Sequence, residues 1–104
     1  MNVFRRDKAL DDVAHHALYL AQNNPDAAQR FIVAFAEATE RLAQMPYLGA
    51  ACYVENPLLF GLRRWPIKGF EKHIIFYLVI EDALDIVRVL HSAQDIATAL
   101  EVEP

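Results

Sequence analysis

The sequence predicts an α+β fold, in which an N-terminal antiparallel helical hairpin packs on a small three- to four-stranded antiparallel sheet and a short C-terminal helix follows. Two segments with apolar residues at helical spacing lie between residues 7 and 44, and three strand-like segments follow between Leu62 and His91. The chain has 104 residues, which is enough for one domain with a single core. We therefore treat residues 1–104 as one domain.

The first helix is predicted to follow a short N-terminal strand that begins at Val3 and Phe4. Asp7 is a candidate N-cap, since its carboxylate can accept hydrogen bonds from the free backbone amides of the first turn. One apolar face is predicted along this helix from residues at helical spacing, namely Leu10, Val13, Ala14, Ala17, Leu20 and Ala21.

The second helix is predicted to begin after Asn24, which is a good N-cap, with Pro25 in the first helical position. It should end near Gln44, because Pro46 disfavours helical geometry at the residue before it. Its predicted apolar stripe consists of Ala28, Phe31, Ile32, Phe35, Thr39 and Leu42. The break between the helices is short, so they should form an antiparallel pair.

The strands are predicted after a connecting loop over residues 45–60. Leu62–Ile67 contains Pro66, which cannot donate to a sheet and therefore favours an edge, a bulge or a strand end. His73–Ile80 is apolar on both faces, as in a central strand that is covered on two sides. The helical hairpin is expected to cover one face. The other face could be covered by the C-terminal tail, by another subunit or by a partner chain. Leu84–His91 forms the third strand, and Ala93–Leu100 the last helical turns.

Composition excludes several classes of function. The net charge is −4, which argues against direct binding of DNA by this chain alone, because contacts to phosphates need a basic surface. The four histidines and the single Cys52 have no metal-ligand spacing, and a chain with three glycines has no phosphate-binding loop. We therefore expect no metal and no cofactor. No signal peptide or membrane span is expected, and a lone cysteine fits a cytoplasmic protein.

Ribonuclease chemistry is the main catalytic alternative, because cleavage of RNA needs an acid, a base and a cation near the phosphate. Arg64, Arg88 and His91 would be the catalytic set. Arg88 and His91 are three residues apart, so strand alternation places them on opposite faces unless a bulge intervenes. The structural alternative is that Arg88 pairs with a carboxylate and that His91 closes a hydrogen bond at the end of the strand.

Three stretches together resemble one family. They are NPDAAQRFIVAFAEATERLAQMPYLG, LRRWPIKGFEKHIIFYLV and IVRVLHSAQDI. In this order they resemble the ParE branch of the ParE/RelE superfamily of bacterial toxins, over about residues 7–96. The resemblance implies the toxin of a type II toxin–antitoxin, or plasmid stabilisation, module, with a helical hairpin on a small antiparallel sheet.

The resemblance also implies a target and partners. ParE-like toxins are associated with inhibition of DNA gyrase and RelE-like toxins with cleavage of mRNA on the ribosome. The implied antitoxin is ParD-like, of the ribbon-helix-helix type, and a homodimer is possible in its absence. The partner-binding residues that we expect are Arg63, Arg64, Trp65, Lys68 and Tyr77.

This chain departs from the family pattern in two ways, in its residues near the end of the last strand and in its charge. Gln94 stands where Arg is frequent, and Ser92 stands where Gly is common. The chain is also acidic, whereas many such toxins are basic. Both departures argue against RNA cleavage, and they leave open an interaction module that has kept antitoxin binding but lost toxicity.

Overall fold

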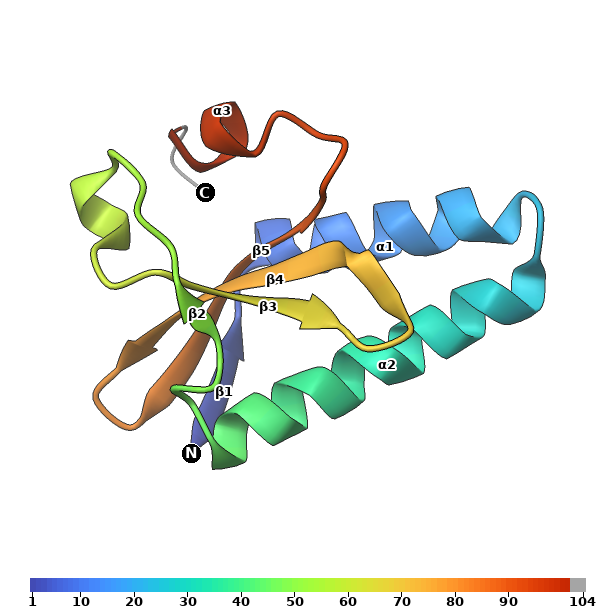
Figure 1. Ribbon diagram of the computed structural model, residues 1–104. Coiled ribbons are helices and arrows are strands. Elements are labelled where there is room, and N and C mark those ends of the chain that lie inside the picture. Colours follow the sequence, from blue (N-terminus) through green and yellow to red (C-terminus); the bar gives the residue numbers. More distant parts are fainter. Residues whose placement is uncertain (102–104) are drawn as a thin grey trace.

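The computed structural model describes residues 1–101 (Figure 1). These residues form three α-helices, five strands and one 3₁₀ turn. In chain order they are β1 (Asn2–Arg5), α1 (Asp7–Ala21), α2 (Pro25–Gln44), β2 (Ala50–Ala51), η1 (Pro57–Leu59), β3 (Arg63–Ile67), β4 (Phe70–Ile80), β5 (Ala83–His91) and α3 (Ile96–Glu101). The predicted α+β class is confirmed.

The sheet has five strands in the order β1-β5-β4-β3-β2, and it is mixed. Strands β2 to β5 pair antiparallel with their neighbours, whereas β1 pairs with β5 in parallel. The prediction of a purely antiparallel sheet with three or four strands is wrong in this respect. It misses the two-residue β2 and the direction of β1, because neither leaves a periodic pattern.

The helical hairpin covers one side of the sheet, which we call the helical face (Figure 1). The side chain of Asn24 accepts a hydrogen bond from the Ala27 amide, which confirms this N-cap, and α2 ends at Gln44 as predicted. Asp7 does not cap α1, because Arg6 is the N-cap residue and Asp7 lies in the first turn. The buried residues of α1 are Ala9, Val13 and Ala17. Leu10 and Ala14, expected in the core, are exposed.

The other side of the sheet, called the second face, carries a separate apolar cluster. Its buried members are Leu59, Leu62, Ile74, Phe76, Leu78, Val87, Leu90 and Leu100. The cover therefore comes from the same chain, from the segment around η1 and from α3 (Figure 1). Of the three alternatives left open by the two-sided apolar strand, the C-terminal tail therefore supplies part of the cover, and the segment around η1 was not among them.

A β-bulge in β5 sets which of its residues face the helices. Phe76 pairs with Arg88 and Tyr77 with Ile86, so Val87 is an extra residue on β5. Ile86 and Val89 both join the cluster on the helical face although they are three residues apart. The bulge lies before Arg88, so it does not change the expectation that Arg88 and His91 face opposite sides.

None of the helices within residues 1–101 is both long and apolar enough to span a membrane.

Candidate partner-binding site

A surface groove runs between α2 and the β3–β4 hairpin, with a volume of about 830 Å³. Small and apolar residues line it on both sides, including Ala34 and Ala38 of α2 and Trp65 and Pro66 of β3. Its charged and polar lining consists of Glu37, Glu40, Arg41, Gln44, Lys68 and Glu71. Protein-binding surfaces commonly combine apolar and charged side chains in this way.

The outer edge of β3 borders this groove and is only partly paired. Strand β2 pairs with Arg63 and Arg64 alone, and Cys52 donates from its backbone to the Leu62 carbonyl. Backbone groups alternate along a strand, so Leu62, Arg64 and Pro66 direct theirs to this edge. Pro66 has no N–H, which removes a donor where the edge is open. A partner can therefore enter the groove more readily as a helix than as an added strand.

Two of the five predicted partner-binding residues, Trp65 and Lys68, line the groove. Trp65 pairs with Ile75 on the helical face and is partly exposed. Arg64 is exposed, but it pairs with Phe76 and so projects to the second face, away from Trp65. The predicted set is thus divided between the two faces.

Arg63 and Tyr77 hold the loop that follows α2 through hydrogen bonds to its backbone. The Arg63 guanidinium donates to the carbonyl of Gly49 at 2.7 Å and lies 5.0 Å from the ring centre of Tyr47. The Tyr77 hydroxyl donates to the Pro46 carbonyl and accepts from the Gly49 amide, both at 2.8 Å. Burial raises the pKa of Tyr77.

Because Tyr77 is completely buried, it is not part of the surface that a partner could touch, and the prediction of a direct contact needs correction. Gly49 is needed beside it, since a Cβ there would collide with the Tyr77 ring and the Arg64 carbonyl.

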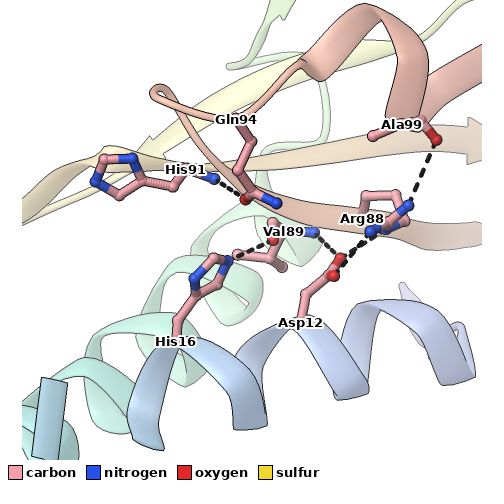
Figure 2. A network of polar contacts seen from close by, with 7 residues as sticks. All are labelled: Asp12, His16, Arg88, Val89, His91, Gln94 and Ala99. Atoms are coloured by element: carbon pink, nitrogen blue, oxygen red, sulfur yellow. Dashed lines mark hydrogen bonds and ion pairs between the residues drawn. The ribbon is translucent and has the colours of Figure 1, made fainter. Parts of the chain in front are cut away.

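A buried ion pair joins α1 to β5 (Figure 2). The Arg88 guanidinium donates to both carboxylate oxygens of Asp12, at 2.7 and 2.9 Å, and both side chains are 13% exposed. Hydrogen bonding to Asp12 is the main cause that raises the pKa of Arg88. A further donation from Arg88 reaches the Ala99 carbonyl of α3 at 3.4 Å. One guanidinium thus connects the first helix, the sheet and the last helix.

Asp12 also acts with His16 on the free edge of β5 (Figure 2). Strand β1 ends at Arg5, opposite Ile86, so it does not reach Val89. The Val89 amide donates to Asp12 at 3.0 Å, and the Val89 carbonyl lies 2.8 Å from Nε2 of His16. Two side chains one helical turn apart therefore satisfy the backbone groups that a longer β1 would have paired.

His91 and Gln94 close the turn between β5 and α3. The His91 amide donates to the Gln94 side-chain oxygen at 2.7 Å, and the Gln94 amide donates to the His91 carbonyl at 2.9 Å. Nδ1 of His91 accepts from the Ala93 amide at 3.0 Å. The Gln94 side chain acts here as an acceptor, which an arginine in its place could not do.

The predicted nuclease set of Arg64, Arg88 and His91 is not assembled in this arrangement. His91 pairs with His73 on the helical face and points away from Arg88 in Figure 2. Arg64 and Arg88 flank Phe76 from the two neighbouring strands, so their backbones are about 10 Å apart. Arg88 is held by Asp12, and His91 by its own turn. Both residues thus follow the structural alternative that the sequence left open.

Metal and thiol chemistry find no support in the described residues. No group of three or more His, Cys, Asp or Glu side chains among residues 1–101 is arranged to hold a metal ion. Burial raises the pKa of Cys52, although Arg64 lowers it in part, so the thiol form is favoured over the nucleophilic thiolate.

Sequence reasoning missed the α2 side of the groove and the role of Asp12. Glu37, Glu40, Arg41 and Gln44 recur at intervals of three or four along α2, but the same pattern describes any solvated helix face. The sequence indicated that Arg88 could pair with a carboxylate, but it contains fourteen acidic residues and nothing in it singled out Asp12.

The comparisons with known proteins concern most of the chain. The sequence model of one family, described as "ParE toxin of type II toxin-antitoxin system, parDE", matches residues 3–96. Among solved structures, one titled "Chromosomal ParDE TA system from P. aeruginosa" aligns with a TM-score of 0.72 at 20% identity, over 88% of this chain and 95% of that chain. At this identity the likeness concerns the fold. A comparison with curated proteins finds no match.

Proposed function

The chain belongs to the ParE toxin family of type II toxin–antitoxin systems, and on this premise we propose that it inhibits DNA gyrase by binding and that a ParD-like antitoxin neutralises it through the groove between α2 and the β3–β4 hairpin. The observation that supports this antitoxin site is the position of Trp65. Its indole is only partly buried and lines the open groove, and such a side chain is a typical anchor for a protein partner.

Binding rather than catalysis is favoured by the state of the basic residues. Arg88 is neutralised by Asp12, and His91 lies on the opposite face of the sheet. A cation that is already paired cannot stabilise a developing phosphate charge without first losing its partner. Arg64 is exposed, and a single arginine cannot supply the acid and the base as well.

The test for the cellular target is a supercoiling assay with purified gyrase and the purified protein. We expect the protein to inhibit supercoiling. We expect Arg88→Lys to inhibit it as well, in proportion to the fraction of the variant that is folded. Unchanged supercoiling combined with ribosome-dependent mRNA cleavage would instead establish the nuclease alternative. If gyrase and mRNA are both unaffected while the antitoxin still binds, the chain is an interaction module without toxicity.

The test for the antitoxin site uses two exposed lysines that form a matched pair. Lys68 lines the groove, whereas Lys72 lies outside it. With the product of the adjacent open reading frame as the probe, we expect Lys68→Glu to weaken binding about tenfold and Lys72→Glu to leave it unchanged. Trp65 is the single tryptophan, so its fluorescence reports occupancy of the groove directly. Equal effects of the two substitutions would place the antitoxin elsewhere.

A further inference from the structure

Three histidines from three different elements pack against one another, edge to face, near the end of the sheet. His73 of β4 lies 4.8 Å from His16 of α1 and 4.8 Å from His91 of β5, measured between ring centres, with ring planes close to perpendicular. Phe31 of α2 and Phe70 of β4 enclose His73 at 4.9 and 6.3 Å. We call His16, His73 and His91 the histidine stack. Neither the groove nor the Arg88 ion pair uses it.

The three rings of the stack are held in different ways. His73 is 8% exposed, and within the described residues its Nδ1 has no hydrogen-bond partner of regular geometry. His91 uses Nδ1 as an acceptor for the Ala93 amide, so this hydrogen bond depends on the position of the His91 ring. His16 donates its Nε2 proton to the Val89 carbonyl. Adding charge to the buried His73 costs free energy of folding.

Among residues 1–101, no opposite charge is placed to compensate for protonation of His73. From α1 and β5 it meets the imidazoles of His16 and His91, and from α2 the ring of Phe31. Glu71 of β4 is bound to the Gly69 amide and exposed, and Lys72 belongs to the alternate side of the strand. Asp12, one turn before His16, is engaged by Arg88. Burial, and then the neighbouring imidazoles, lower the pKa of His73 to about 4.

The stack is coupled to the cover of the second face through His91. The backbone and the ring of His91 make three hydrogen bonds in the turn before α3, and the Ser92 amide adds a fourth to the Lys72 carbonyl. Helix α3 has six residues and is held by the burial of Leu100, with Ile96 and Ala99 packed beside it. A hydrogen bond from Asn56 reaches the Leu100 carbonyl, besides the long contact from Arg88. A segment this short depends on its entry turn for its position.

We propose that the histidine stack is a proton-sensitive latch: when His73 at its centre is protonated, the neighbouring His91 ring is displaced, the turn after β5 opens and α3 leaves the second face before the rest of the protein unfolds. The surface that this step uncovers is the apolar cluster that contains Leu59, Ile74 and Leu90. The helical hairpin keeps its own cluster on the opposite face, so the expected acid state has an intact helical face and an open second face.

An NMR titration of the full chain between pH 7.5 and 4 tests this order of events. We expect the amide signals of Ala93, Gln94 and α3 to lose protection together, in step with His73, while those of α2 and β4 persist. His15, which is exposed on α1 outside the stack, serves as the reference histidine. Simultaneous loss of all amide signals would overturn the proposal, because it would describe ordinary acid unfolding.

Two variants separate the latch from a general effect of acid. His73→Phe replaces the central ring with an aromatic side chain that cannot titrate, and we expect opening of α3 to move to lower pH by about one unit. His91→Asn keeps an acceptor near the position of Nδ1 but removes the ring that contacts His73, so we again expect α3 to open at lower pH. With this second variant, a fold defect caused by His73→Phe does not decide the test alone. His15→Asn is the control. An unchanged opening midpoint in His91→Asn, or an equal shift in His15→Asn, would exclude the latch.

Discussion

The two faces of the sheet carry apolar clusters of comparable character, but their covers differ. The helical face is covered by α1 and α2, which have 15 and 20 residues. The second face is covered by a 3₁₀ turn of three residues and by α3 with six. Long helices contribute many buried side chains to one cooperative unit, whereas a short segment can detach on its own. We infer from this difference that burial on the helical face determines whether the chain folds. The short cover of the second face determines where the folded chain opens first.

The ion pair between Asp12 and Arg88 is expected to have the largest effect, because it joins the covers of both faces. Arg88→Ala should lower the free energy of unfolding by about 3 kcal/mol, since it leaves Asp12 charged, poorly solvated and without its partner. Chemical denaturation measures this change. The control is Arg30→Ala, whose ion pair with Asp26 is exposed and contributes about 0.3 kcal/mol. Similar losses in the two variants would mean that the buried pair has no special role.

Two fully buried leucines, one under each cover, compare the faces directly. Leu42→Ala on α2 should cost about 3 kcal/mol in global stability, because the cavity it leaves lies within the helical face. Leu100→Ala on α3 should cost about 1 to 2 kcal/mol, because α3 can detach without unfolding the sheet. Denaturation gives the global value and hydrogen exchange the local one. Equal global losses would show that the two covers unfold as one unit.

The pH dependence of stability follows from His73. Its pKa in the folded protein is about 4, below the ordinary value of 6.5, so between these values the unfolded chain binds more protons than the folded one. Stability is therefore fully present above pH 6.5 and is lost as the pH falls toward 4, by about 3 kcal/mol. Denaturation curves at several pH values check this window. His73→Phe should flatten the curve there, and an unchanged slope would assign the dependence to other groups.

Gln94 is expected to have the smallest effect, confined to the turn before α3. Gln94→Arg removes the acceptor for the His91 amide and should cost about 1 kcal/mol, seen as faster hydrogen exchange at His91. Gln94→Glu keeps an acceptor and is the matched control. If the arginine variant protects the turn as well as the wild type does, the family-like residue is compatible with this geometry after all.

The elements with clear periodic patterns could be predicted from the sequence. Asn24 and Pro25 mark the start of α2, and the run from His73 to Ile80 is apolar on both faces of β4. Each of these features depends on residues close together in the chain. The fold class and the need for a second cover follow from them.

The features that escaped prediction depend on residues far apart in the sequence. Asp12 and Arg88 are 76 positions apart, and nothing local distinguishes Asp12 from other acidic residues on helices. The extra residue Val87 in β5 has no turn residue to mark it. Tyr77 lies in the strand that was predicted to be covered on both faces, but only the loop around Gly49 shows that its hydroxyl binds within the chain. The candidate groove is likewise a tertiary feature, formed where α2 passes the β3–β4 hairpin.

The parallel pairing of β1 with β5 has a consequence for the order in which the chain can fold during synthesis. Asn2 pairs with Ala83, and Asp12 and His16 bind the backbone of Val89, so the N-terminal strand and the first helix wait for partners that are made much later in translation. Contacts so distant in sequence form late and slow the folding of small proteins. A ribosome-bound fragment that ends before β5 should therefore lack the closed fold, which forms only once β5 has emerged.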